Sequence, residues 1–259
     1  MSTFIKTEME GSVFKITLNR PDKFNSFNRE MALQMQAALD KAAADKAIRA
    51  VYITGEGKAF CAGQDLAEAL DKTGPGIERI VREHYNPIIL KMRALEKPIV
   101  CAVNGVAAGA GANIALACDV VIAATSVAFI QAFSKIGLVP DNGGSFFLPR
   151  LIGFGKASAL MMLGDKISAS DAEKMGMIYK VSDDDKLHTD GMLIAKTLSE
   201  SPTKAIGLTK RMLNQSMDNT LEQQLECEAQ MQVKAALTND YDEGVSAFLG
   251  KRKPVFKGE

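Results

Sequence analysis

Asp141 is the residue whose surroundings best suit acid–base chemistry. It follows the apolar run Gly137-Leu138-Val139-Pro140 and precedes Gly143 and Gly144. A carboxyl group among apolar side chains has a raised pKa, which is what a general base near neutral pH requires. An aspartate that shapes a turn or caps a helix is commoner in such a setting. Local sequence alone therefore favours the structural role over the catalytic one.

Two turns of small residues form a second candidate site. One spans 58–66, Lys-Ala-Phe-Cys-Ala-Gly-Gln-Asp-Leu, and the other spans 103–111, Val-Asn-Gly-Val-Ala-Ala-Gly-Ala-Gly. Both follow a predicted strand, and the second opens a predicted helix. Small residues let a ligand approach backbone N–H groups closely, so two facing turns could hold a developing oxyanion between two donors. Tight packing of helix on strand explains the same glycines equally well, and both interpretations stay open.

The remaining reactive side chains form no catalytic or metal-binding pattern. Neither His84 nor His188 stands beside a nucleophile or at a metal-ligand spacing, so ordinary structural roles are expected. The four cysteines are scattered without a Cys-x-x-Cys pair: Cys61, Cys101, Cys118 and Cys227. This pattern argues against a zinc site and a disulfide framework, and it suits a reducing cytoplasm.

Charge and hydropathy exclude further classes of protein. The 259 residues include 31 Lys and Arg against 31 Asp and Glu, so the basic excess of a nucleic-acid binder is missing. The N-terminus lacks the apolar stretch of a signal peptide, which predicts a cytoplasmic protein. Residues 98–118 are free of charge over about the length of a membrane span, but Asn104-Gly105 and Gly109 interrupt them. We expect a buried strand, a turn and a buried helix there.

Strands and helices alternate through the first 200 residues, which predicts an α/β fold with parallel pairing. The predicted strands are residues 4–9, 13–18, 49–54, 99–103 and 120–123, the first two forming a hairpin at Glu10-Gly11. The predicted helices are residues 29–46 with Asn28 as N-cap, 76–95 with a kink or restart at Pro87, and 109–118.

The chain changes character after Ser201-Pro202. Residues 203–216 and 220–238 are predicted helices, and the spacing of Thr220 and Gln223 predicts a capping box. We therefore expect a core domain over 1–200, carrying the site, and a helical region over 201–259. The helical region is too small to bury itself alone, so it should pack on the core or on another subunit.

Taken together, these motifs resemble the enoyl-CoA hydratase/isomerase (crotonase) superfamily over essentially the whole chain. The matching segments are Leu18-Asn19-Arg20-Pro21, Asn25-Ser26-Phe27, Phe60 to Leu66, Lys97 to Gly105, Ala117-Cys118-Asp119 and Phe248 to Pro254. The resemblance implies a spiral of ββα turns, a C-terminal helical trimerisation region, and assembly as a homotrimer or a hexamer (a dimer of trimers). It also implies a coenzyme A thioester substrate, with coenzyme A as part of that substrate and no metal or separate cofactor.

The resemblance also assigns candidate site residues. It places the thioester oxygen between the backbone N–H groups of Gln64 and Ala110. Ala110 stands where the family commonly has glycine, but only its N–H is required. The implied coenzyme A channel is lined by Lys23, Phe24, Ala62, Gln64 and Leu66. Phe248 and Lys251 are candidates to close it, around a neighbouring subunit's ligand, with a solvated basic tail as the alternative for Lys251.

The acid–base residues point to one reaction within the superfamily. Its hydratases use two glutamates, at positions that hold Asn113 and Phe133 here, and neither residue can exchange a proton in that role. Its isomerases place an aspartate at the position of Asp141, so the resemblance implies an acyl-CoA isomerase with Asp141 as base. The alternatives are an enoyl-CoA hydratase or lyase with its acid–base groups elsewhere, and a non-catalytic member that binds CoA or RNA. Whether residues 67–80 form an ordered lid is left open.

Overall fold

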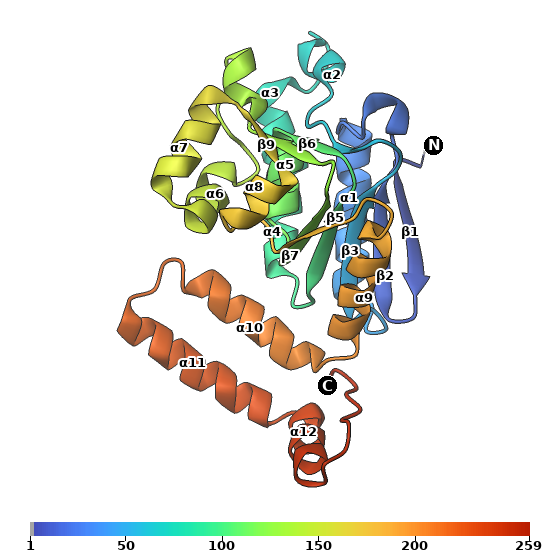
Figure 1. Cartoon of the computed structure of the whole chain (residues 1–259), viewed down its shortest axis with the longest axis vertical. Helices are drawn as coiled ribbons and strands as arrows, with labels where there is room; N and C mark the ends of the chain where they lie inside the picture. Colours follow the sequence, from blue (N-terminus) through green and yellow to red (C-terminus); the bar gives the residue numbers. More distant parts are fainter. Residues whose placement is uncertain (1–2) are drawn as a thin grey trace.

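The computed structural model describes residues 3–259, and its centre is a six-stranded sheet (Figure 1). The strands lie in the order β1-β2-β3-β5-β7-β10. Their bounds are β1 (Ile5–Glu10), β2 (Val13–Leu18), β3 (Ala50–Gly55), β5 (Ile99–Val103), β7 (Val120–Ala124) and β10 (Lys180–Ser182). The β1–β2 hairpin is antiparallel and all other pairs are parallel. Every residue of β3 and β5 is buried, as expected for parallel strands covered on both faces.

A smaller four-stranded sheet lies beside the first. It contains β4 (Ala59–Cys61), β6 (Val106–Ala108), β8 (Ala128–Ile130) and β9 (Lys166–Ser168), in that order. The chain passes from β3 to β4, from β5 to β6 and from β7 to β8, so each pass adds one strand to each sheet before a helical segment follows. The expected α/β fold of ββα turns is confirmed.

Helices cover the large sheet on both faces. Helix α9 (Leu187–Ser199) packs across β3 and β5, whereas α1 (Arg29–Ala44) packs on β1 and on α4 (Asn86–Ala94) (Figure 1). The Asn28 side chain accepts a hydrogen bond from the Met31 amide, so the predicted N-cap of α1 is confirmed.

The segment predicted as one helix over 76–95 has three parts. It consists of α3 (Gly76–Arg79), a π-helical turn η2 (Ile80–Tyr85), and α4, which restarts with Pro87 in its first turn. The short helix α2 (Leu66–Leu70) precedes it, so α2, a turn and α3 make up residues 67–79.

The middle of the chain forms a helical layer around the small sheet. It comprises α5 (Ala110–Leu116), the 3-10 turn η3 (Ala132–Ile136), α6 (Gly144–Ile152), α7 (Phe154–Leu163) and α8 (Ala169–Lys174).

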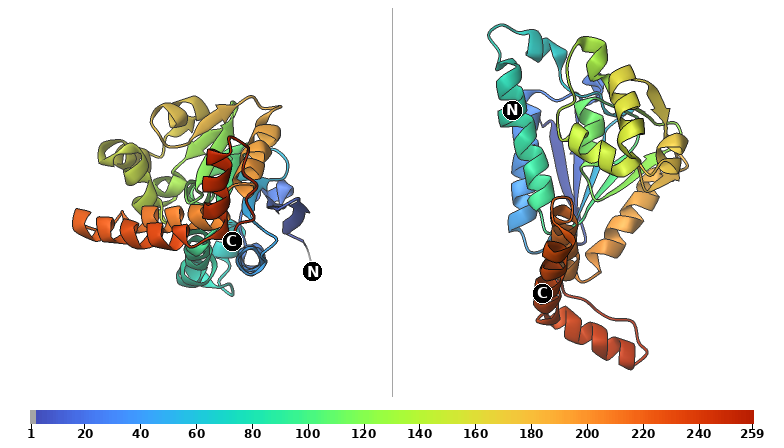
Figure 2. Two further views of the ribbon diagram at one scale, coloured as in Figure 1. Left: turned by 90° about the horizontal axis from the view of Figure 1, so that it is seen from below. Right: turned by 90° about the vertical axis from the view of Figure 1, so that its left-hand side faces the viewer.

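Three helices at the C-terminus, which we call the C-terminal arm, extend away from the sheets. Helix α10 (Thr203–Gln215) packs against α11 (Leu221–Ala236), and α12 (Asn239–Leu249) lies at the end of this arm (Figures 1 and 2). Both halves of the Thr220–Gln223 capping box are present. Helix α12 was not predicted, although the Thr238 side chain caps it and Asp240 and Asp242 stand in its first turn. The domain boundary near residue 200 stays a prediction.

Within residues 3–259, no helix combines the length and the apolar character needed to cross a membrane.

Candidate functional site

A cavity of about 220 Å³ brings the two small-residue turns and Asp141 together. Its walls come from the loop after β4, the start of α5, the α3–η2 segment, and η3 with the residues that follow it. The apolar part of the lining includes Leu66, Ile77, Ile80, Val81, Phe133 and Leu138. Polar groups come from Gln64, Tyr85, Lys135 and Asp141. A small number of polar groups in an apolar cleft is typical of a small-molecule site.

The backbone of Gln64 offers one free donor at this cavity. Phe27 N–H donates to Gly63 O (2.7 Å) and Phe27 O accepts from Asp65 N–H (2.8 Å), which forms an isolated parallel bridge. Because adjacent residues of an extended chain alternate in direction, the Gln64 N–H points away from Phe27. It has no acceptor within residues 3–259.

Ala110 offers a second donor. It is the first residue of α5, whose leading N–H groups lack intrahelical acceptors, and its amide is unpaired in the described part of the chain. The required turn is made one residue earlier by Gly109, at φ 52° and ψ −123°, so Ala110 itself keeps helical backbone angles that alanine readily adopts. A Cβ placed on Gly63 would lie 3.5 Å from Ala110 N, which shows how closely the two turns approach.

The Asp141 carboxyl group completes the cavity. Its Oδ1 is buried and has no hydrogen-bond partner among residues 3–259. Burial raises its pKa from 3.8 to about 6, and a backbone hydrogen bond acts weakly in the opposite direction. A carboxylate with this pKa is largely ionised at neutral pH and still basic enough to take a proton from carbon.

The two positions where hydratases carry glutamate hold side chains that cannot exchange a proton. Phe133 lines the cavity. Asn113 is fully buried; its Nδ2 donates to Asp141 O (2.9 Å) and its Oδ1 accepts from Gln131 Nε2 (2.8 Å). Gly144 leaves room for this amide, since a Cβ there would lie 2.3 Å from Asn113 Nδ2. Asn113 therefore holds the backbone of the candidate base.

The structure brings most of the predicted channel residues to the cavity. Ala62, Gln64 and Leu66 line it. Phe24 lies beside it, because its carbonyl oxygen accepts from the Ala62 N–H (2.9 Å), and both Phe24 and Lys23 are exposed.

Phe248 and Lys251 do not reach the cavity of their own chain. They lie at the end of the C-terminal arm, at the opposite end of the molecule from α2 and α3 (Figure 1). Within one chain they cannot close the site.

Several residues that line the cavity were not predicted from the sequence. Ile77, Ile80, Val81 and Tyr85 come from the α3–η2 segment, and Lys135 comes from η3. Tyr85 is fully buried, and its hydroxyl donates to Gln64 Oε1 (2.8 Å). No local motif marks this contact, because it joins two residues that are 21 positions apart in the sequence.

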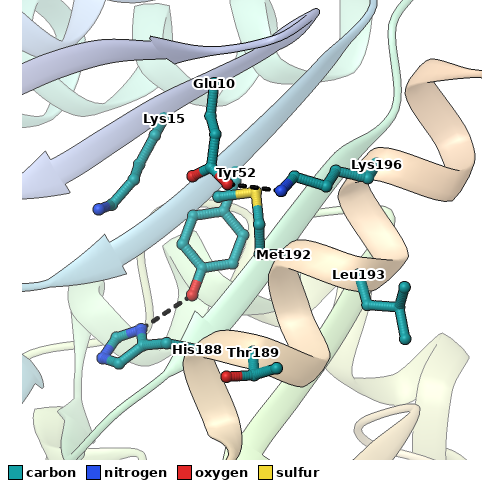
Figure 3. Close-up of a pocket in the computed structure, with 8 residues that line it drawn as sticks. All are labelled: Glu10, Lys15, Tyr52, His188, Thr189, Met192, Leu193 and Lys196. Carbon is teal, nitrogen blue, oxygen red and sulfur yellow. Dashed lines mark hydrogen bonds and ion pairs between the residues drawn. The ribbon is translucent and has the colours of Figure 1, made fainter.

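A larger groove of about 420 Å³ lies between β1–β3 and α9 and contains His188 (Figure 3). The Tyr52 hydroxyl points at His188 Nδ1 (2.9 Å), and Lys196 pairs with Glu10 (2.6 Å). Burial raises the pKa of Tyr52 and lowers that of His188, so both stay neutral near pH 7. His84 lies against Arg29 Nη1 (3.0 Å), with its pKa lowered by burial. Neither histidine contacts Asp141 or lines the cavity that contains it.

The cavity can thus bind a carbonyl oxygen at two N–H donors and present one carboxylate to the bound molecule. This arrangement suits proton abstraction next to a carbonyl group.

Comparison with known proteins agrees with this chemistry. Residues 8–259 match the family described as Enoyl-CoA hydratase/isomerase. A 1,2-epoxyphenylacetyl-CoA isomerase of Escherichia coli K12 is 46% identical, with 100% of each chain covered. A probable enoyl-CoA hydratase of Rhodobacter capsulatus is 41% identical over 98% of each chain. The crystal structure of a putative enoyl-CoA hydratase/isomerase from Mycobacterium abscessus superimposes with a TM-score of 0.94, at 38% identity, covering 98% of this chain and 100% of that one.

Proposed function

Because this chain belongs to the enoyl-CoA hydratase/isomerase family, we propose that it is an acyl-CoA isomerase in which Asp141 moves a proton through a thioester enolate. The observation that carries the proposal is the single cavity containing one buried carboxylate and two unpaired backbone donors. The two positions that hydratases fill with glutamate are Asn113 and Phe133, which leaves Asp141 as the one carboxylate in the lining.

The proposed reaction has two proton transfers. Asp141 takes a proton from the carbon next to the thioester carbonyl, and the electron pair moves onto the thioester oxygen. The N–H groups of Gln64 and Ala110 stabilise the resulting enolate, and Asp141 returns the proton further along the acyl chain. A general base typically contributes 10²–10⁴-fold and an oxyanion donor roughly 10²–10³-fold.

The acyl group is proposed from sequence likeness and from the cavity lining. Residues 107–112 and 132–141 most resemble those of ring-1,2-epoxyphenylacetyl-CoA isomerase, and a relative of that name is 46% identical. The apolar lining with Phe133 suits an aromatic or alicyclic ring. Phe129 and Phe147 are buried in the core and do not line the cavity.

Conversion of a Δ3-enoyl-CoA to its conjugated Δ2 isomer tests the proposal, with the native protein compared with Asp141→Asn. We expect the substitution to abolish conversion while the affinity for the CoA thioester is retained. Hydration of a 2-enoyl-CoA that survives Asp141→Asn would instead support the hydratase alternative. That is the activity named for the 41% identical relative, a probable enoyl-CoA hydratase.

We also propose that the chain works as a homotrimer or a dimer of trimers. Helices α11 and α12 and the turn between them leave large apolar side chains exposed: Leu221, Leu225, Val233, Leu237, Phe248 and Leu249. Exposed apolar surface of this extent indicates a protein interface.

A further inference from the structure

Tyr85 lines the cavity from a π turn that interrupts the helical segment carrying it. Ile77, Ile80 and Val81 line the cavity from the same segment. In a regular α-helix, residue 85 would lie about 40° from Val81, at 100° per residue, and so on the same face. The wider turn over Ile80–Tyr85 changes the rotation of Tyr85 within this face. Isolated π turns are rare and often occur at functional sites.

The Tyr85 hydroxyl makes one specific contact, with the side chain of Gln64. It donates to Gln64 Oε1 at 2.8 Å, while the ring is fully buried with its centroid 6.0 Å from that of Phe27. Burial raises the pKa of Tyr85 well above its ordinary value, so the hydroxyl stays protonated and remains a donor throughout the accessible pH range.

The amide nitrogen of the Gln64 side chain is hydrogen-bonded as well. Its Nε2 donates to Glu68 Oε2 (3.2 Å) and to Asp65 O (3.3 Å). Both carboxylate oxygens of Glu68 accept from the Arg29 N–H at the start of α1 (2.9 and 3.0 Å). A flipped Gln64 amide would turn its oxygen towards the Glu68 carboxylate, so the orientation that accepts from Tyr85 is the favourable one.

We infer that Tyr85 is a positioning residue for the oxyanion site: its hydroxyl, acting through the Gln64 side chain, restrains the Gln64 backbone N–H in the direction that the bridge to Phe27 sets. This inference rests on the proposed function only in assigning that N–H to the thioester oxygen. Tyr85 does not itself exchange a proton with the substrate, because its one O–H is committed to Gln64.

The direct test is the infrared carbonyl band of bound phenylacetyl-CoA labelled with ¹³C at the thioester carbon, which requires binding and no turnover. The native protein should shift this band to lower frequency, and Tyr85→Phe should reduce the shift while the dissociation constant stays within about threefold. Tyr179→Phe, at a site that is 69% exposed, is the matched control and should behave as native. A loss of packing alone would lower the melting temperature or the affinity without changing the band of the bound thioester.

A second variant tests the same contact in case Tyr85→Phe fails to fold. Gln64→Met keeps the backbone donor and the side-chain length but removes the acceptor for Tyr85. It should reduce the shift as Tyr85→Phe does, and the double variant should lose little more, because both changes break the same contact. For Δ3-to-Δ2 conversion, each variant should lower kcat by roughly three- to tenfold with little change in KM.

The outcomes separate this inference from the proposed reaction. A native band shift that Tyr85→Phe leaves intact overturns the role of Tyr85 and leaves the isomerase proposal standing. A native shift that the variant reduces, in a protein that does not isomerise, supports Tyr85 and rejects the reaction. No shift in the native protein rejects the oxyanion site, and the role of Tyr85 with it.

Discussion

The Asp141 carboxylate is placed where its negative charge is disfavoured. Its folded-state pKa of about 6 lies above the ordinary 3.8 because of burial. As a base it must be ionised, so isomerisation should rise with pH through about 6 and level off above 7. A pH profile of kcat/KM checks this expectation. A profile whose acid limb lies near pH 4 would show that the base is a solvated carboxylate and not Asp141.

The same burial should make Asp141 a cost to stability at neutral pH. A carboxyl group with a raised folded-state pKa stabilises the fold most when it is protonated, below pH 3.8, and this contribution is lost as pH rises through about 6. At pH 7, Asp141→Asn should therefore raise the free energy of unfolding, by about 1–3 kcal/mol. Urea denaturation at pH 7 and pH 3.5 measures it; the difference between the two proteins should shrink at the lower pH. A variant that is less stable than native at pH 7 would contradict the argument.

The environment of Asp141 was predictable from sequence and that of Tyr85 was not. An apolar run next to Asp141 is a local signal of burial, and Leu138 does line the cavity beside it. Helical spacing places Tyr85 on the same face as Val81, but it does not indicate that the Tyr85 hydroxyl contacts Gln64. Nothing in the residue types of 80–85 marks the change from an α to a π turn.

At the scale of elements, Asn113 joins helix α5 to the turn that carries Asp141. Asn113→Asp keeps the shape but replaces the donor to Asp141 O with an acceptor. We expect a loss of about 1–3 kcal/mol in the free energy of unfolding, because two acceptors then face each other in the core. The new carboxyl group should also raise the pKa of Asp141 and move the acid limb of the activity profile to higher pH.

Urea denaturation and a pH profile of this variant give the two readouts. Asn239→Asp is the control, since Asn239 is exposed at the start of α12, where an added acid is tolerated. Native stability in Asn113→Asp would mean that the Asn113–Asp141 contact does not hold the turn.

Helices that begin at a side-chain cap were predictable from the sequence, and strands of three residues were not. Asn28 and Thr220 mark the starts of α1 and α11 through side-chain caps that the structure contains. The strands of the small sheet have three residues each, which is too short for a periodic pattern to emerge. Their pairing depends on the large sheet, whose parallel strands bring 58–66 and 103–111 side by side.

At the scale of the whole molecule, an ion pair with one buried partner, Lys210, joins the C-terminal arm to the core. Lys210 of α10 is buried and its Nζ lies 2.8 Å from Asp119 Oδ2. The same carboxylate accepts from the Ile99 N–H (2.9 Å) and pairs with Arg93 (2.8 Å). Asp119→Asn should lower the free energy of unfolding by roughly 2–4 kcal/mol, because it leaves the Lys210 ammonium buried without its counter-charge.

Urea denaturation of this variant and of the double variant Asp119→Asn/Lys210→Met distinguishes two causes of the loss. One is the unpaired charge of Lys210, and the other is the loss of the remaining Asp119 contacts. The double variant should recover part of the loss, because no unpaired buried cation remains. Equal losses in the two would indicate that Asp119 acts mainly through Ile99 and Arg93.

The position of Phe248 and Lys251 predicts that substrate binding depends on the assembly of subunits. Because they lie at the far end of the molecule from the cavity, they can close only the cavity of a neighbouring subunit (Figure 1). A variant that dissociates the assembly, such as Leu237→Glu at an 82% exposed position, should then raise KM for the CoA thioester severalfold. Its kcat at saturating substrate should stay close to native, since Gln64, Ala110 and Asp141 all belong to one chain.

Sedimentation velocity and steady-state kinetics on the same samples check both parts, and Ser145→Glu, at an exposed site on α6, is the control for added charge. A dissociated variant with native KM would show that Phe248 and Lys251 have no part in substrate binding.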